Sequence, residues 1–298
     1  MSKTVAYLQA NKQAYLIIAH KDDIVFRTLI QMLDHPKNDI FIHMDAKNKS
    51  YDPAETLKLV KCSRIFHVPR IKVTWGGYSQ IHAELTLLEV ATSEGNYEHY
   101  HLLSGQCLPI KKQDEIITFF ESHRGAEFMS IRKNFEGEER VRFYYPFQEI
   151  KGRKGNVIVR AINQISIKLQ RSLHIWRNKA INFRRGGNWF SITDGLARYV
   201  LSKRDWIRTV FHDTLCCDEV FLQTITADSP FAINLFSRRN SKMMSPANMR
   251  LIDWKRGRPY TFRMSDLEQI KSSSAMFARK FDGDIDTEII MKIQELYS

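Results

Sequence analysis

Pairs of carboxylates are the residues of this 298-residue chain whose type and spacing most directly suggest chemistry. Asp218 and Glu219 stand side by side, and such a pair either removes a proton from a substrate or caps the helix that follows. Asp284 and Asp286 are spaced like a metal-binding pair, but their position predicts a surface turn or a helix cap. The cysteines form no CxxC pair for zinc and no disulfide framework; they are Cys62, Cys107, Cys216 and Cys217. We therefore expect a reduced, cytosolic protein.

Positive charge is in excess, since the formal net charge is +12 at pH 7 and the isoelectric point is about 9.5. This balance predicts an anionic partner: nucleic acid, phospholipid or a phosphorylated small molecule. Segment 151–185 carries cations and no Asp or Glu; the cations are Lys151, Arg153, Lys154, Arg160, Lys168, Arg171, Arg177, Lys179, Arg184 and Arg185. Apolar residues interleave at helical spacing, which predicts either a surface helix for anionic membrane lipid or a solvated helix packed on the core. We expect no nucleic-acid partner, because no nucleic-acid-binding signature accompanies the segment.

The first 125 residues alternate between short apolar runs and helical patterns, which is typical of an α/β sheet. Strands are expected at 15–20, 39–45, 64–68 and 97–103, and helices at 24–33, 79–91 and 114–121. Ligands of such sheets lie beyond the carboxyl ends of the strands, so we expect His20, Asp45 and Ser104 around one crevice. Neither a GxGxxG motif nor a P-loop motif opens a helix, which argues against a Rossmann dinucleotide site.

The N-terminal segment and the rest of the chain lack the apolar runs of targeting and membrane-spanning segments. Residues 1–12 have no stretch of signal-peptide length, and no segment approaches 18 uninterrupted apolar residues. We expect a cytoplasmic protein, with peripheral association with the inner membrane face if segment 151–185 binds lipid. The expected division is a lead-in, 1–13, followed by one domain, 14–298, in which Gly186 and Gly187 are the expected hinge.

Seven motifs in the same order resemble the core-2/I-branching glycosyltransferases, which include the β-1,6-N-acetylglucosaminyltransferases and are related to the peptide O-xylosyltransferases. The motifs are Ala14–Lys21, Phe41–Lys47, Trp75–Ser79, His101–Ile110, Gly187–Ile192, Cys217–Phe221 and Met276–Asp282. The resemblance implies a single GT-A-type, Rossmann-like α/β domain with a mostly parallel central sheet and flanking helices. It implies a nucleotide-binding half, 14–125, and an acceptor and catalytic half, 126–298. The implied reaction is inverting transfer of a sugar from a UDP donor.

By this resemblance, Glu219 is the catalytic base that deprotonates the acceptor hydroxyl. Most GT-A enzymes hold the donor diphosphate through a metal bound by Asp-x-Asp, but that position here reads Ser104–Gln106. The resemblance implies that no metal and no other cofactor is needed, because basic side chains hold the diphosphate. Lys280 matches the lysine of the family, and Arg256 or Arg258, on either side of the aligned position, would supply the partner arginine.

The resemblance also implies residues for the nucleotide and the acceptor. His20, Asp45 and Trp75 would bind the nucleoside, although His20 read alone is equally a loop histidine and Trp75 a core residue. The acceptor-binding residues would be Trp254, Arg140 and Asp218. Trp254 read alone is as well explained as a core tryptophan, and Asp218 would orient the loop or cap the next helix.

The leading interpretation is an inverting, metal-independent glycosyltransferase of a bacterial type, because animal members begin with a signal anchor and are rich in disulfides. Its acceptor would be a glycan or a lipid-linked oligosaccharide in surface polysaccharide synthesis. N-acetylglucosamine is the default sugar. The alternative is a non-catalytic protein on the same fold that binds glycan or lipid.

Overall fold

The centre of the structure is a five-stranded sheet with the strand order β3-β2-β1-β4-β6. The computed structural model describes residues 12–132, 134–151, 157–239 and 246–298. The strands of this sheet are β1 (Gln13–Ala19), β2 (Asn38–Met44), β3 (Arg64–His67), β4 (His99–Ser104) and β6 (Ser191–Ile192). β1 pairs in parallel with β2 and β4, and β2 with β3, whereas β6 runs antiparallel to β4. The parallel strands therefore end at one edge, where their loops can form a common site.

Alternate residues of β1 enter two hydrophobic cores, one on each face of the sheet. Tyr15 and Ile17 belong to one core, and Ala14 and Leu16 to the other. All four side chains are 0% exposed. A strand that is buried on both faces has a continuous apolar run instead of an alternating pattern, which explains the sequence of β1.

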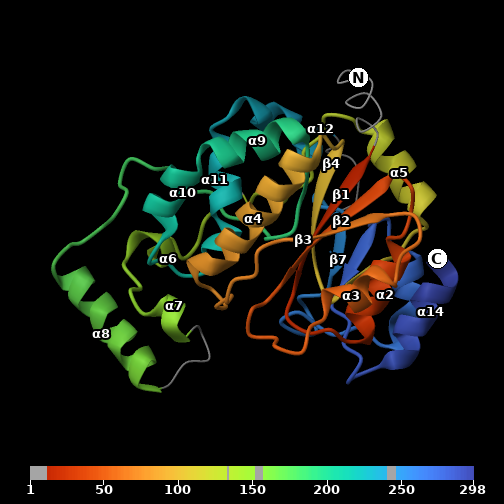
Figure 1. Ribbon diagram of the computed structural model, residues 1–298. Coiled ribbons are helices and arrows are strands. Elements are labelled where there is room, and N and C mark those ends of the chain that lie inside the picture. The colour runs from red at the N-terminus through yellow and green to blue at the C-terminus, as the bar shows by residue number, and fades with distance from the viewer. Residues whose placement is uncertain (1–11, 133, 152–156, 240–245) are drawn as a thin grey trace.

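Helices cover both faces of the sheet (Figure 1). The first core includes residues of α2 (Ile24–Met32), α5 (Gln113–Ser122) and α14 (Thr287–Tyr297), with α3 (Pro53–Leu57) on the same side. The second core includes residues of α4 (Tyr78–Glu94), α9 (Asp194–Ser202), α10 (Arg204–Phe211) and α11 (Phe221–Ala227). The strand edge therefore opens between two helical layers, and its loops are the part of the sheet that can hold a ligand.

A second sheet of three strands, in the order β5-β8-β7, lies beside the carboxyl end of β4. Its strands are β5 (Cys107–Pro109), β7 (Arg250–Ile252) and β8 (Phe277–Arg279). β5 follows β4 after a short turn, so β8 reaches the same edge of the main sheet. The remaining elements are α6 (Glu139–Arg142), α7 (Gln148–Lys151), α8 (Val157–Ser172), η1 (Cys217–Glu219), η2 (Pro230–Asn234), α12 (Phe236–Arg239), η3 (Met264–Asp266) and α13 (Leu267–Lys271).

The predicted fold class is confirmed: the protein is α/β with a mostly parallel central sheet and flanking helices. All four strands and three helices expected in the first 125 residues are present, with ends that differ by a few residues. The first strand begins at Gln13, inside the expected lead-in, and most of that lead-in lies outside the described residues. The boundary between the halves at residue 125 stays a prediction, although β6 of the second half completes the sheet of the first.

Candidate active site

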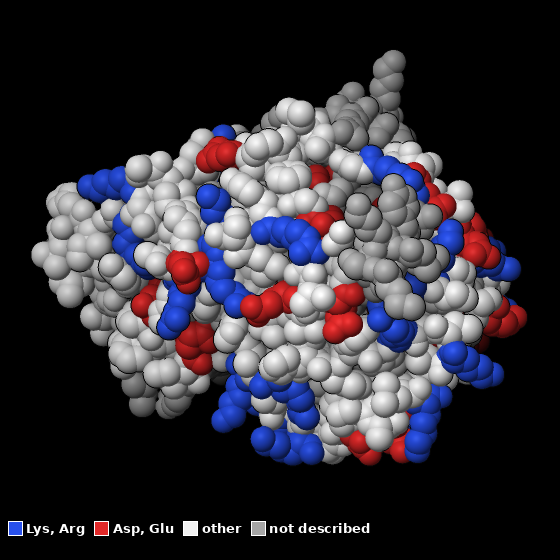
Figure 2. All heavy atoms as spheres, turned by 45° about the horizontal axis from the view of Figure 1, so that its top comes forward, with Lys and Arg blue, Asp and Glu red and all other residues white. Residues whose placement is uncertain are grey.

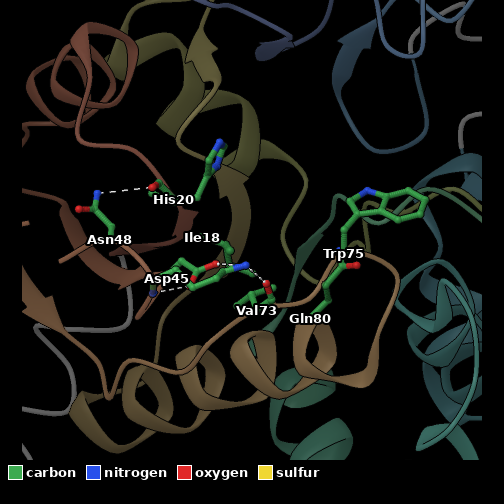
Figure 3. A pocket seen from close by; sticks show the side chains of 9 residues that line it. Ile18, His20, Asp45, Asn48, Val73, Trp75 and Gln80 are labelled. Carbon is green, nitrogen blue, oxygen red and sulfur yellow. Dashed lines mark hydrogen bonds and ion pairs between the residues drawn. The ribbon is translucent and has the colours of Figure 1, made fainter. Parts of the chain in front are cut away.

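The loops after β1 and β2 form a pocket of about 490 Å³. It is lined by Ile18, Ala19, His20, Asp45, Lys47, Asn48, Val73, Trp75 and Gln80. Figure 3 shows Asp45 below His20, with Trp75 across the pocket to the right of both. The prediction that His20 and Asp45 share a crevice is confirmed. Ser104 is not one of the lining residues, but β4 places it beside Ile18 at the same sheet edge.

Asp45 is a fixed hydrogen-bond acceptor in this pocket. It directly follows β2 and is 5% exposed, and its backbone N–H donates to the carbonyl of Ala19 at 2.8 Å. Oδ1 accepts from the backbone N–H of Lys47 at 2.8 Å, and Oδ2 lies 3.2 Å from Lys47 Nζ. Nζ also donates to the carbonyl of Val73 at 2.6 Å. The pocket thus presents an oriented carboxylate next to an ammonium group that the sequence analysis did not select.

His20 and Trp75 stand at opposite rims of the pocket. Trp75 is 49% exposed, and an indole ring at a pocket rim is suited to contact with a planar ligand. Asn48 donates through Nδ2 to the carbonyl of His20 at 3.4 Å. Partial burial is the main cause that lowers the pKa of His20, and the charges of Lys21 and Arg279 act in the same direction. A neutral imidazole, which both donates and accepts, is therefore the favoured form near pH 7.

Arg279, the last residue of β8, lies against the turn at Ser104–Gln106. The backbone N–H of Phe281 donates to the carbonyl of Gln106 at 3.0 Å, and Arg279 donates to Oγ of Ser104. Arg279 also lies 4.7 Å from the ring centroid of Trp189. Lys280, the predicted diphosphate ligand, lies 3.6 Å from Asp282. Arg279 was missed because the resemblance pointed to Lys280 and nothing in the sequence showed that its neighbour faces Ser104.

The structure distinguishes Arg256 from Arg258. Arg256 binds Asp253 at 2.6 Å, Asp266 at 2.6 Å and Gln269 at 2.9 Å, so its donors serve the local fold. Arg258 is exposed and makes no hydrogen bond or ion pair with any described residue. Of the two predicted partners of Lys280, Arg258 is the one whose donors no described residue occupies. The predicted diphosphate role of Arg256 is not supported by these contacts.

Trp254, predicted to bind the acceptor, is 62% exposed. The alternative that it is a core tryptophan is therefore wrong. Its exposed ring is suited to stacking on a sugar, and that role stays a prediction.

Glu219 lies in η1, and the described residues hold one of its carboxylate oxygens but not the other. Oε2 accepts from Arg140 NH1 at 3.0 Å and from Arg185 at 3.0 Å (Nε) and 2.7 Å (NH2). Oε1 has no hydrogen-bond partner among the described residues, and the side chain is 31% exposed. A carboxylate that is fixed through one oxygen can take a proton through the other. Arg140 thus contacts the predicted base, and its acceptor role stays a prediction.

Asp218 is buried behind Glu219 and connects it to the pocket. Its Oδ2 accepts from Nε2 of Gln80, a pocket residue, at 3.1 Å. Burial, and secondarily the charge of Glu219, raises the pKa of Asp218 to about 7. The suggestion that Asp218 caps the next helix is wrong, because α11 begins after Val220 without a side-chain cap. Its acceptor role stays a prediction, while the contact with Gln80 makes it a link between the two parts of the site.

A fully buried carboxyl on α4 lies close to this link. Glu84 is 0% exposed, and neither of its oxygens has a hydrogen-bond partner that meets ordinary geometry. Burial is the main cause that raises its pKa well above the usual value, and the charge of Asp218 adds to the effect. Burial therefore favours the neutral form of Glu84, and the sequence analysis did not select this residue.

Gly186 closes the wall of the site next to Glu219. Its N–H donates to the carbonyl of Glu219 at 2.9 Å. A Cβ at this position would lie 1.7 Å from the carbonyl oxygen of Ser130, so only glycine fits. Gly186, one of the two glycines of the expected hinge, is therefore a site of close backbone packing.

The acidic pair near the C-terminus has a structural role. Asp286 is the N-cap of α14 and accepts from the backbone N–H of Ile289 at 3.1 Å, as one of the two alternatives predicted. Asp284 is exposed and lies 3.3 Å from Lys21. Over the described ranges, no group of three or more His, Cys, Asp or Glu is placed to hold a metal ion.

Comparison with known proteins gives matches over most of the chain. Residues 13–274 match the family model described as Branch: Core-2/I-Branching enzyme. A xylosyltransferase of Ciona intestinalis is 23% identical over 304 residues, which cover 93% of this chain and 33% of that protein. A beta-1,3-galactosyl-O-glycosyl-glycoprotein beta-1,6-N-acetylglucosaminyltransferase of Bos taurus is 22% identical over 311 residues, 95% of this chain and 68% of that protein.

A shorter match has higher identity. A probable beta-1,3-galactosyl-O-glycosyl-glycoprotein beta-1,6-N-acetylglucosaminyltransferase 7 of Sus scrofa is 30% identical over 112 residues, 37% of this chain and 26% of that protein. The chain thus spans about a third of the length of the Ciona relative and about a quarter of the pig relative.

Proposed function

The chain belongs to the core-2/I-branching enzyme family, and we propose that it transfers a sugar from a UDP donor to a hydroxyl group of a glycan. The transfer inverts the anomeric carbon and needs no metal ion. The observation that carries the proposal is Glu219, which Arg140 and Arg185 hold through Oε2 while Oε1 has no partner among the described residues. Its neighbour Asp218 accepts from Gln80, which lines the pocket at the strand ends. A general base next to a nucleotide-sized cavity is the pair of features that direct displacement requires.

The pocket between His20 and Trp75 takes the nucleoside in this proposal. The carboxylate of Asp45 accepts hydrogen bonds from the ribose hydroxyls, since its oxygens are already oriented by Lys47. Trp75 offers its exposed ring to the base, and His20 offers a neutral imidazole. The burial of Asp45 and the position of the His20 and Trp75 rings at the rims of the pocket support this placement of the nucleoside.

In this proposal, basic side chains bind the diphosphate as it leaves the sugar. Lys280 and Arg258 bind its oxygens, and Arg279 adds a third positive charge next to the Ser104–Gln106 turn. Fixed cations stabilise the charge that develops on the leaving group in the same way as a divalent ion does. Arg258 supports this role because its guanidinium is exposed and uncommitted among the described residues, unlike that of Arg256.

The reaction is a single displacement. Glu219 Oε1 takes the proton of the acceptor hydroxyl while that oxygen bonds to the anomeric carbon from the face opposite the diphosphate. The bond between the anomeric carbon and the diphosphate oxygen breaks, and its electron pair leaves with UDP. Arg140 and Arg185 keep the carboxylate in place, which contributes to catalysis by orientation.

The relatives indicate only the class of sugar that is transferred and the class of acceptor. The relatives named above include a xylosyltransferase and N-acetylglucosaminyltransferases, so xylose and N-acetylglucosamine are the donors to try first. We keep N-acetylglucosamine as the default, and a glycan or lipid-linked oligosaccharide as the acceptor. These relatives are animal proteins, and the bacterial surface-polysaccharide role stays a prediction.

UDP release from a panel of UDP-sugars, measured in excess EDTA with Glu219→Gln as the control, tests the proposal. We expect release from at least one donor by the native chain, and unchanged UDP binding but no turnover in the variant. Turnover that survives Glu219→Gln would exclude this residue as the base. UDP binding without turnover of any donor, with glycan acceptors present, would favour the non-catalytic alternative.

A further inference from the structure

Helix α8 projects from the body of the protein and carries an exposed apolar stripe (Figure 1). The stripe consists of residues 3 or 4 apart on one helix face: Ile162 (40% exposed), Ile165 (64%), Leu169 (57%) and Leu173 (60%), of which the last follows the helix. A single exposed leucine is ordinary, but a continuous row of aliphatic side chains marks an interaction surface.

Helix α8 also has a buried face, which other residues form. Ile167 is 8% exposed and packs with Phe143 and Tyr145. Gln170 is 6% exposed, donates to the carbonyl of Tyr144 at 3.1 Å, and accepts from the N–H of Tyr144 at 2.8 Å. The apolar stripe is therefore not the side by which α8 attaches to the protein. The contacts of Ile167 and Gln170 fix the orientation of α8, and with it the direction that the stripe faces.

The charged residues of α8 and of the loop that follows it are all positive. Residues 157–185 contain no Asp or Glu. Arg171 is paired with Glu139 of α6 at 3.0 Å, but Lys168 and Lys179 are exposed and form no ion pair with a described residue. Trp176, just after the helix, is 39% exposed. Aliphatic residues with an exposed lysine beside them, and a second lysine and a tryptophan in the segment that follows, are typical of a helix that lies in a membrane interface.

We propose that α8 docks on an anionic lipid surface, with the stripe of Ile162, Ile165, Leu169 and Leu173 among the acyl chains. Lys168, which precedes Leu169 in the helix, then lies at the level of the lipid phosphates. A second copy of the chain is a poorer occupant, because a symmetric contact through this stripe would bring Lys168 of both copies together. Elsewhere on the surface, Lys and Arg are interspersed with Asp and Glu on the face shown in Figure 2. None of the described helices is long and apolar enough to span a bilayer, so the contact is one of docking.

Docking through α8 orients the candidate active site. Two neighbouring residues of α6 connect α8 to the predicted base. Glu139 binds Arg171 of α8, and Arg140 binds Glu219. The connection from the stripe to the base is therefore short and made of packed residues. A docked α8 brings the Glu219 side of the protein toward the membrane, which favours a membrane-anchored acceptor. This consequence rests on the proposed function, whereas the docking itself does not.

Vesicle sedimentation tests the docking without any substrate. The probes are vesicles of phosphatidylcholine with 30% phosphatidylglycerol and vesicles of phosphatidylcholine alone. We expect binding to the anionic vesicles that weakens in 0.5 M salt, and a loss on the order of tenfold or more in the double variant Ile165→Asp, Leu169→Asp. The matched control is Leu57→Asp, at a side chain in α3 that is 50% exposed on another part of the surface.

Three outcomes would overturn the proposal. The first is no binding of the native chain to anionic vesicles, and the second is an equal loss in Leu57→Asp. The third is a native dimer that the stripe variant converts to a monomer without any effect on vesicle binding, which would assign the stripe to a second copy. UDP binding measured on the same proteins separates this test from the proposed function, because the stripe variant is expected to bind UDP as the native chain does.

Discussion

Removal of the Arg185 side chain tests whether the orientation of Glu219 matters for the reaction. Arg185 supplies two of the three hydrogen bonds to Oε2, and Arg140 supplies the third. Hydrogen bonds to a charged group contribute about 1.5–3 kcal/mol, and Arg140 remains in the variant, so we take the lower half of this range. A loss of about 1.5–2 kcal/mol from the transition state corresponds to a rate reduction of about 10- to 30-fold.

The test measures the initial rates of the Arg185→Ala variant as a function of donor concentration, which give kcat and KM. We expect kcat to fall by that factor while KM for the UDP-sugar stays within about twofold, because Arg185 contacts the base and not the pocket. Guanidinium ion added to the buffer should restore part of the rate, which a purely structural role would not allow. Arg184→Ala is the matched control, since the contacts of Arg184 with Thr224 are made by its backbone. Equal rates for the two variants, or a change confined to KM, would refute the reasoning.

Three further changes probe the buried acid, the diphosphate site and the nucleoside site. Because Asp218 has a pKa of about 7 in the folded chain and about 3.9 when unfolded, its ionisation lowers stability as pH rises through this window. Asp218→Asn should therefore gain stability over the native chain by about 3 kcal/mol more at pH 8 than at pH 5, which denaturant titrations at the two pH values measure. Arg258→Ala should weaken UDP binding at unchanged Tm, whereas Arg256→Ala should lower Tm because it breaks three side-chain contacts; the reverse pattern would exchange their roles. Asp45→Asn should raise the Kd for UDP about tenfold, since an amide accepts hydrogen bonds less strongly than a carboxylate, and an unchanged Kd in calorimetry would remove Asp45 from the site.

The parts of the site that could be predicted are those that follow local sequence. A buried apolar run ends at Ala19, and another ends at Met44, so the residues after them had to lie at one edge of a parallel sheet. His20 and Asp45 were placed correctly for this reason. Asp286 was predicted as a helix cap or a turn from its position alone, and it is the cap.

The parts that could not be predicted depend on partners far along the chain. Arg185 and Glu219 are separated by 34 residues, and no local pattern indicates their contact. Arg256 differs from Arg258 because Asp266 and Gln269 approach it after the chain turns back. Gly186 was predicted as a hinge because the sequence does not show that it packs against the carbonyl of Ser130, which lies in another segment. In each case tertiary packing decides what a residue type can do.

Calorimetric titration of the native chain with UDP in excess EDTA tests the central claim most directly. We predict binding with a Kd on the order of micromolar without metal, and weakening of about tenfold or more in Lys280→Met. Lys292→Met, in an exposed ion pair of α14 with Glu295, is the control and should bind UDP unchanged. Binding that requires manganese would contradict the cation clamp, and no binding in either buffer would contradict the nucleotide-sugar site itself.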